Sequence, residues 1–298
     1  MVLAKKVVVR MFGGLGNQLF IYAAARRLAL TTRSELIIDD VSGFAHDHEY
    51  QRHYQLVHFN LSCRQATPAE RMEPGSRARR FLKRKINQFL PFRFRSYVQQ
   101  KGMDFEARLL DLNPRSVLYL EGYWQGEDYF KDIEWVLRGD LQIKPPTDAQ
   151  NLEMSSQIQA CTAVAVHVRF FDMPGELGVT NAPVDYYARA VAKMEELIPG
   201  AHYFVFSDQP DSARRCIPLS DDRITCVVHN RADEQAYADL WLMTQCQHFI
   251  IANSTFSWWG AWLSASPEKQ VIAPGYKKLE GKAWWGFDGL LPNRWIKL

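Results

Sequence analysis

Ala163-Val164-Ala165-Val166-His167-Val168-Arg169 is the stretch that decides how this 298-residue chain folds. It is apolar until its end, which is the pattern of a strand buried on both faces of a parallel α/β sheet. His167 and Arg169 are two residues apart, so both side chains leave the strand on one face. Ligands of such sheets gather at the carboxyl ends of strands, and a guanidinium suits phosphate oxygens. The pair predicts a nucleotide-phosphate site, with a structural ion pair of Arg169 as the competing interpretation.

The chain after this stretch alternates between strand and helix patterns. Apolar runs ending in turn residues predict strands, and apolar residues at helical spacing predict the helices between them. The expected strands are 161–168, 201–206, 223–229, 248–252 and 270–273, and the expected helices are 184–197, 233–246 and 256–265. This alternation predicts a parallel, doubly wound sheet.

The first half begins with a β-loop-α-β unit. A β-branched strand at 6–11 leads into a glycine loop, a helix over 18–31 and a strand at 35–40. Val117–Leu120 is a further expected strand and 128–137 a further helix, whereas 63–105 has the character of a helical or irregular insertion. Pro145-Pro146 indicates a linker, so we expect domains at 1–150 and 151–298. The predicted fold is α/β of the GT-B type, with two Rossmann-like domains facing a central cleft.

Composition limits the class of protein. Apolar residues make up 47% of the chain and the net charge is only +3, so a folded core is expected and nucleic acid is not. Five cysteines lie without paired or metal-binding spacing, which indicates reduced thiols and a cytoplasmic protein. The start of the chain has neither the pattern of a signal peptide nor the length of a transmembrane anchor.

One segment carries a local excess of positive charge. Residues 77–101 hold nine basic residues and no acidic one, and apolar side chains are set among them. Such a segment could rest on an anionic membrane surface or hold an acidic partner. The competing interpretation is a solvated helix face. Peripheral membrane contact through 77–95 is thus one expectation.

The glycine loop Gly13-Gly14-Leu15-Gly16-Asn17-Gln18 is a second candidate site. Its glycines allow close backbone approach, helix-start amides attract anions, and the amide of Asn17 can donate to a phosphate or sugar oxygen. A dinucleotide site is an alternative, because Asp39 and Asp40 lie near the place of a ribose-binding acid. However, Leu19 stands where the third glycine of that fingerprint belongs. A tight turn without a ligand is the remaining interpretation.

Two more strands of the second half end in polar residues. Phe206-Ser207-Asp208 places a carboxylate that could bind a base or ribose, or simply initiate the turn before Pro210. Asn253-Ser254-Thr255 supplies N-cap chemistry and an anion cradle for the following helix. Trp258 and Trp262, one helical turn apart, are assigned to the core rather than to sugar stacking.

The loop after Arg169 supplies candidates for a general base. Asp172 and Glu176 could each take a proton, although a solvated loop carboxylate is the competing interpretation of both. No Asp-x-Asp occurs in the chain, so no metal is expected. Arg169 and helix-end amides would then neutralise a phosphate leaving group.

Four ordered motifs together resemble glycosyltransferase family 11, the α-1,2-fucosyltransferases that use GDP-fucose. They are Gly-Gly-Leu-Gly-Asn-Gln-Leu-Phe at 13–20, His-Val-Arg at 167–169, Phe-Ser-Asp at 206–208, and Asn-Ser-Thr-Phe-Ser-Trp-Trp-Gly-Ala-Trp-Leu at 253–263. The chain departs from many members at Phe170, where a second arginine is common, and at Gln209, where an aspartate is common. Many members have His-x-Arg-Arg-x-Asp, and the aspartate of that pattern is displaced here to Asp172.

The resemblance implies an inverting, metal-independent transfer of L-fucose from GDP-β-L-fucose to the 2-hydroxyl of a terminal galactoside. The first domain would serve the acceptor and the second would bind GDP-fucose as co-substrate. The acceptor would be a galactose-terminated oligosaccharide or glycolipid. Arg169, Asp172, Glu176 and Asn17 are the expected catalytic residues. The expected donor-binding residues are Gly14, Asn17, His167, Arg169, Asp208, Ser254, Thr255 and Phe256.

Two other functions remain open from the residues alone. A nicotinamide-dependent oxidoreductase would use the first glycine loop, and a carbohydrate-binding protein without turnover would use the tryptophans. Titration with NAD(P) against GDP separates the first from a glycosyltransferase. Release of GDP from GDP-fucose would exclude a carbohydrate-binding protein without turnover.

Overall fold

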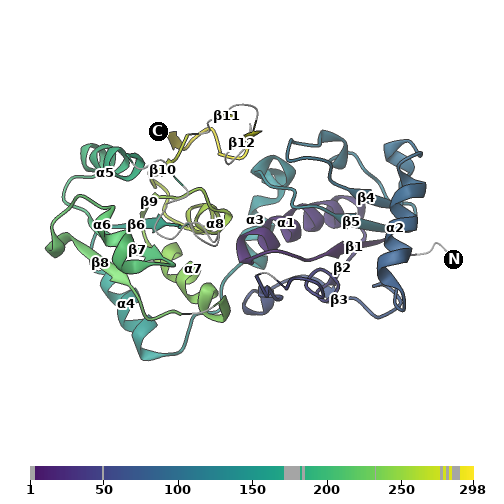
Figure 1. Cartoon of the computed structure of the whole chain (residues 1–298), viewed down its shortest axis with the longest axis horizontal. Coiled ribbons are helices and arrows are strands. Elements are labelled where there is room, and N and C mark those ends of the chain that lie inside the picture. Colours follow the sequence, from purple (N-terminus) through teal and green to yellow (C-terminus); the bar gives the residue numbers. More distant parts are fainter. Residues whose placement is uncertain are drawn as a thin grey trace. The chain divides into compact units, whose positions relative to one another are not determined.

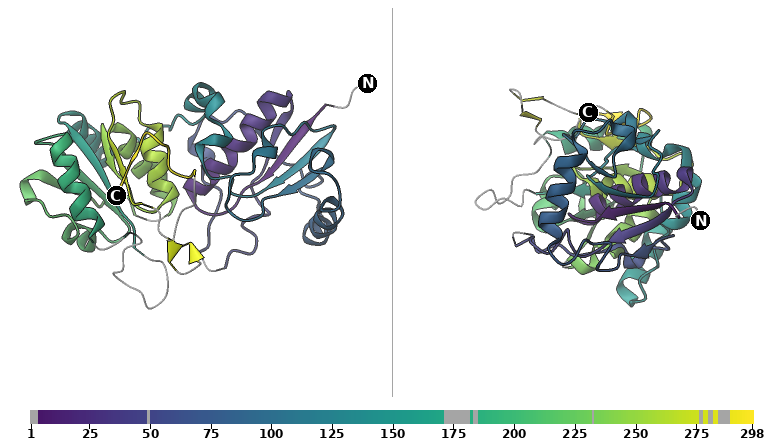
Figure 2. Two further views of the ribbon diagram at one scale, coloured as in Figure 1. Left: turned by 90° about the horizontal axis from the view of Figure 1, so that it is seen from above. Right: turned by 90° about the vertical axis from the view of Figure 1, so that its right-hand side faces the viewer.

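The structure is a computed structural model that describes residues 4–48, 50–170, 182, 185–231, 233–275, 278–279, 282–283 and 289–298. The chain divides into two compact units, Met1–Gln142 and Ile143–Leu298 (Figures 1 and 2). The division precedes the expected boundary at 150/151. Helix α4 (Ala149–Gln159) follows the proline pair and packs against α7 (Ala236–Gln245), which explains why residues just before 150 belong to the second unit.

The described part of the first unit contains a parallel sheet in the order β3-β2-β1-β5-β4. Every neighbouring pair runs parallel, and β1 lies between β2 and β5. The short β-branched strand β1 supplies Val7 and Val9, which are fully buried. The strands are β1 (Lys6–Arg10), β2 (Glu35–Asp39), β3 (Arg64–Gln65), β4 (Tyr97–Gln99) and β5 (Val117–Glu121).

Helices flank this sheet. Helix α1 (Leu15–Thr32) is apolar on most of its circumference and its buried residues reach from Leu15 to Ala29, so it is enclosed by the unit. The other helices are α2 (Ser76–Asn87) and α3 (Glu134–Asp140), with 3₁₀ turns at Leu56–His58, Phe92–Phe94, Ala107–Leu109, Glu127–Tyr129 and Lys131–Ile133. The helix expected at 128–137 is thus only partly correct, because 3₁₀ turns precede α3.

A helical or irregular insertion was expected at 63–105. Helix α2 lies within it, but the expectation was wrong near the two ends of this range, where the chain forms strands of the sheet. Strands β3 and β4 both lie within this range and form the two edges of the sheet. They contain two and three residues. Strands this short carry too few residues to show an alternating pattern, so the sequence could not reveal them.

The second unit contains a parallel sheet in the order β13-β10-β9-β6-β7-β8. The observed strands follow the expected ones closely, and the edge strand β13 was not expected. They are β6 (Ala163–Val168), β7 (His202–Ser207), β8 (Ile224–Val227), β9 (His248–Ile250), β10 (Val271–Ala273) and β13 (Ile296–Lys297). A separate pair consists of β11 (Lys278–Leu279) and β12 (Lys282–Ala283).

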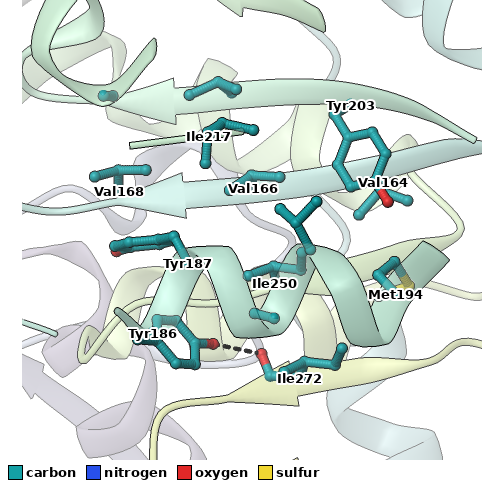
Figure 3. Packing of buried hydrophobic residues seen from close by; sticks show 14 of the residues in the cluster. Val164, Val166, Val168, Tyr186, Tyr187, Met194, Tyr203, Ile217, Ile250 and Ile272 are labelled. Carbon is teal, nitrogen blue, oxygen red and sulfur yellow. Dashed lines mark hydrogen bonds between the residues drawn. The ribbon is translucent and has the colours of Figure 1, made fainter. Parts of the chain in front are cut away.

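One hydrophobic core cluster of the second unit lies between β6 and helix α5 (Tyr186–Leu197). Val164, Val166 and Val168 lie on one face of β6 over α5, which contributes Tyr186 and Tyr187 to the same cluster (Figure 3). The remaining helices are α6 (Pro210–Arg215) and α8 (Thr255–Leu263), with 3₁₀ turns at Asp221–Arg223 and Asp233–Gln235. Since side chains alternate along a strand, His167 and Arg169 leave β6 on the face opposite α5.

Two properties of the described residues bear on the expected class. No helix among them combines the length and the apolar character that crossing a membrane requires. The five cysteines form no disulfide, and Cys246 is buried.

Candidate active site

The candidate site lies at the carboxyl end of β6. Figure 1 shows β7 and β8 on one side of β6, and β9 and β10 on the other. Strand β13 lies next to β10 at the edge, so the order across the sheet, counted from β6 as the first strand, is 3-2-1-4-5-6. The strand order therefore reverses between β6 and β9. Sheets of this order bind nucleotides outside the strand ends at this reversal. His167 is the second-last residue of β6 and Arg169 follows its last one, and Asn253–Phe256 follow β9, so both motifs meet at the reversal.

His167 is held as a neutral imidazole. Its side chain is 5% exposed, and the ring packs 5.5 Å from that of Phe256 between centroids. Burial, with a smaller contribution from the charge of Arg169, lowers the pKa of His167 to about 3. Its Nδ1 atom is buried, and no group among the described residues hydrogen-bonds to it. A buried polar atom left in this way costs about 1–3 kcal/mol, which a ligand could recover.

Arg169 forms the ion pair that the competing interpretation required. Its Nη1 atom lies 3.3 Å from Oδ2 of Asp208, and 28% of the arginine side chain stays exposed. Asp208 also accepts the backbone N–H of Phe170 through Oδ1 at 3.2 Å. The carboxylate therefore ties the ends of β6 and β7 together and holds the guanidinium at the strand end. In the turn before α6, the N–H of Gln209 donates to the hydroxyl of Ser207 rather than to the carboxylate of Asp208.

The first turn of α8 forms the other side of the site. Ser254 is its N-cap, and the Ser254 hydroxyl accepts the N–H of Phe256 at 3.3 Å. Thr255 and Phe256 open the helix, and Phe256 contacts His167. The amide dipoles of a helix sum to a partial positive charge at this end. Arg169 and the start of α8 thus give one edge of the sheet a positive character suited to a phosphate.

The tryptophans of α8 belong to the core. Trp258, Trp259 and Trp262 are at most 1% exposed, and the indole N–H of Trp258 donates to the carbonyl of Leu290 at 2.9 Å. These rings pack against one another and against Trp295. The core assignment of Trp258 and Trp262 was correct. The predicted bases Asp172 and Glu176 lie outside the described residues.

The glycine loop of the first unit is a rigid turn. Gly13 has a φ of +75°, and a Cβ there would lie 3.0 Å from the side-chain amide of Asn17. Gln18, fully buried, donates to the carbonyls of Gly13 and His53, each at 2.8 Å, and accepts the N–H of Gln55. Gly13 is therefore needed by the turn itself.

Gly14 and Asn17 lie in the same loop but differ from Gly13. A Cβ at Gly14 would meet only the guanidinium of Arg52, at 3.9 Å, so the protein itself does not require a glycine there. Asn17 accepts a 2.8 Å hydrogen bond from Gln125, which follows β5. Gln18, itself a member of the loop, and Gln125 organise it, and Gln125 and Arg52 were missed as its neighbours. Gln125 and Arg52 carry no motif signal, since only folding brings them to the loop.

Asp39, one of the two acids considered for a dinucleotide site, has an internal role. Asp39 is buried, accepts the N–H of Ser42 at 2.9 Å, and hydrogen-bonds the Ser42 hydroxyl. A ribose would have to displace these bonds. Among the described residues, no three His, Cys, Asp or Glu side chains gather in a way that could hold a metal ion.

Comparison with known proteins identifies the family. The model of "Glycosyl transferase family 11" matches residues 6–282, which is nearly the whole chain. The chain belongs to glycosyltransferase family 11. It is therefore a glycosyltransferase, which the four motifs predicted. Membership of this family favours transfer over the oxidoreductase and the pure binding protein.

Two curated relatives from Escherichia coli match over almost their full length. The O-antigen biosynthesis glycosyltransferase WbnK is 27% identical, with 96% of this chain and 98% of the relative covered. An alpha-1,2-colitosyltransferase is 29% identical, with 98% of each chain covered. The two relatives carry different named activities.

Solved fucosyltransferases share the fold. NodZ alpha-1,6-fucosyltransferase soaked with GDP-fucose aligns with a TM-score of 0.52 at 14% identity, covering 87% of this chain and 92% of NodZ. A mutant of Arabidopsis thaliana FUT1 in complex with GDP aligns with a TM-score of 0.53 at 14% identity, covering 93% of this chain and 71% of that one. The likeness confirms the predicted GT-B-type α/β fold with two parallel sheets.

Proposed function

We propose that this family 11 glycosyltransferase transfers L-fucose from GDP-β-L-fucose to the 2-hydroxyl of a terminal galactoside, with inversion and without a metal. One observation carries the donor assignment. At the sheet reversal, Arg169 and the first turn of α8 supply positive charge beside the buried, neutral His167. Solved neighbours of the same fold contain GDP-fucose or GDP, which supports a guanosine diphosphate donor.

The proposed roles in the second unit follow from these positions. Arg169 holds the diphosphate and stabilises charge on the departing GDP oxygen, as preorganised donors do for oxyanions. The unsatisfied Nδ1 of His167 meets the nucleotide. Ser254, Thr255 and Phe256 contact it through the helix start. Asp208 orients Arg169 through the 3.3 Å pair and contacts the ribose or base.

The transfer itself needs a base. The bond between C1 of fucose and the diphosphate oxygen breaks and its electrons leave with GDP, while the acceptor oxygen bonds C1 from the opposite face. This converts the β-linked donor into an α-linked product. Asp172 or Glu176 removes the acceptor proton, a contribution of about 10²–10⁴-fold. Gly14 and Asn17 bind donor phosphate or fucose from the glycine loop, and the first unit serves the acceptor.

A second candidate donor is favoured by one relative. The alpha-1,2-colitosyltransferase is 29% identical over nearly the whole chain. Its linkage supports attack by a 2-hydroxyl, and its sugar makes colitose the alternative to fucose. The acceptor in either case is a galactose-terminated oligosaccharide or glycolipid.

The test is a donor and acceptor screen. Purified protein is incubated with GDP-fucose, other GDP-sugars and activated colitose against a panel of galactosides, with and without EDTA, and the product linkage is determined by NMR. We expect an α-1,2-fucosylated product and full activity in EDTA. A different linkage, a β-product, or loss of activity with EDTA would overturn the corresponding part of the proposal. The role of Arg169 is tested in the same assay with Arg169→Ala, which should lose activity. Arg189→Ala, which changes an exposed arginine of α5, is its control and should keep the activity of the parent.

A further inference from the structure

Helix α2 of the first unit packs with its polar side inward. The residues on its inner side include Arg80, which lies near Asp39, and Lys83 and Asn87. The Lys83 ammonium lies 4.8 Å from the centre of the Tyr119 ring, and the Asn87 carbonyl oxygen accepts the backbone N–H groups of Ser96 and Tyr97. In an ordinary surface helix the apolar stripe faces the core. Here that side of the helix is occupied by cations and an amide.

The apolar residues of this segment face solvent instead. Phe81, Leu82 and Ile86 are 55%, 60% and 54% exposed, and Phe89 just beyond the helix is 81% exposed. Helical spacing puts the three residues of α2 on the side away from Arg80 and Asn87. A cluster of bulky exposed apolar side chains on one element marks an interaction site rather than the scatter of single residues on most surfaces.

Cations surround these apolar residues. Arg77, Arg79 and Lys85 are exposed on the same helix, and 77–101 contains no acidic residue. Between α2 and β4 lies a cavity of about 310 Å³, lined by the basic residues Arg84, Lys85, Arg95 and Lys101 with Phe81 and Tyr97 among its walls. We call the exposed residues Arg77, Arg79, Phe81, Leu82, Lys85, Ile86 and Phe89 the α2 surface. Figure 1 shows α2 beside β4.

The geometry points to an anionic lipid bilayer as the partner of the α2 surface. A helix with exposed Phe and Leu side chains flanked by Lys and Arg is the type that lies in the membrane interface, with apolar side chains in the acyl boundary and cations at the headgroups. The basic cavity beside it is large enough for a headgroup phosphate. Apolar side chains and cations alternate along this one segment, which matches the acyl boundary and the charged headgroups of an anionic bilayer together, and an acidic protein is the other occupant that the test below distinguishes. This inference is independent of the sugar-transfer reaction.

Vesicle co-sedimentation of the full chain tests the inference. Vesicles of phosphatidylcholine alone are compared with vesicles that also contain phosphatidylglycerol. We expect binding only to the anionic vesicles, weakened by high salt because surface charges are screened. Arg77→Gln/Arg79→Gln/Lys85→Gln removes three cations and should lower the partition coefficient on the order of 100-fold. Leu82→Gln/Ile86→Gln/Phe89→Gln should lower it at least about tenfold through lost apolar burial.

Matched variants separate this surface from general charge and apolarity. Val57→Gln/Trp135→Gln changes exposed apolar residues elsewhere in the first unit, and Arg189→Gln/Lys193→Gln changes exposed cations of α5. Both should bind vesicles as the parent does, and circular dichroism should show all variants folded. The inference is overturned if the parent binds neither vesicle or both equally, if the α2 variants bind unchanged, or if only an acidic polypeptide such as polyglutamate binds.

Discussion

The Nη1 atom of Arg169 lies 3.3 Å from Oδ2 of Asp208, so the cation at the end of β6 is held by an acid at the end of β7. The pair joins the neighbouring strands β6 and β7, and β6 is one of the two strands between which the sheet order reverses. A cation positioned in this way is oriented before any ligand arrives, and preorganised charge of this kind is what stabilises a departing anion.

Replacing Arg169 should therefore impair transfer severely. We expect Arg169→Ala to lower kcat/KM about 10²–10³-fold, the typical effect of removing an oxyanion donor. Arg169→Lys should recover only part of this, because an ammonium lacks the planar fork. GDP affinity, measured by calorimetry, should fall in parallel. Full activity of Arg169→Ala would refute the diphosphate assignment.

Asp208 should act mainly through Arg169. Asp208→Asn keeps an oxygen that can accept the N–H of Phe170 but removes the negative charge beside the guanidinium. We expect a loss of about tenfold in kcat/KM, smaller than for Arg169→Ala, as for a charge-assisted hydrogen bond of modest net strength. Double-mutant kinetics measure the coupling. Strictly additive losses would show that the two residues act separately.

The two neighbouring glycines of the first loop should respond differently to alanine. Gly13→Ala puts a side chain at φ +75° and against Asn17, so we expect a loss of stability of about 1–2 kcal/mol. Gly14→Ala meets only Arg52 at 3.9 Å and should melt as the parent does. If a substrate approaches the backbone at Gly14, this stable variant should still lose activity. A fully active Gly14→Ala would remove Gly14 from the site.

His167 should make stability fall in acid. Its pKa is lowered to about 3 in the folded state by burial, below the value near 6.5 of an unfolded histidine. The unfolded state then binds the extra proton between those values, so stability is complete above about pH 6.5 and falls by up to about 1.4 kcal/mol per pH unit below it. His167→Gln removes this dependence. The free energy of unfolding is measured in urea at pH 6.5 and pH 4.5 for the parent and for His167→Gln. An equal loss of stability between the two pH values in both proteins would contradict the assignment.

Asp239 of α7 should have the opposite effect. Burial raises its pKa to about 7, although its Oδ1 accepts a hydrogen bond from Asn230 at 2.8 Å. The unfolded carboxyl ionises near pH 4, so stability is greatest below that and falls as pH rises to 7. Asp239→Asn keeps the acceptor without the charge. We expect it to match the parent at pH 4 and to exceed it by about 1–3 kcal/mol at pH 8 in urea unfolding.

Trp258 and Trp135 make a matched pair for the core assignment. Trp258 is fully buried and donates to Leu290, whereas Trp135 is 80% exposed. Trp258→Ala should cost about 3–5 kcal/mol, as large-to-small core changes do, and Trp135→Ala should be close to neutral. Thermal melting measures both. An unchanged melting temperature for Trp258→Ala would show that the ring is not part of the core.

The sequence predicted much of the second unit because its strands are long apolar runs that end in polar residues. The strand ending in His167 and Arg169 and the helix after Asn253-Ser254 could both be located from that pattern. The edge strands β3 and β4 could not, since they have two and three residues. The outward-facing apolar residues of α2 were visible as a pattern, but their direction was not, because either face of an amphipathic helix can pack inward.

Local sequence therefore determined which residue types stand at the strand ends and in the glycine loop. Tertiary structure alone decided their partners. The order of strands brings Asp208 to Arg169 and Phe256 to His167 across long separations in the chain, and burial then changes the pKa of His167. Composition and periodicity describe one segment at a time. Hydrogen-bond partners and desolvation depend on which segments meet, and that is settled only when the sheet assembles.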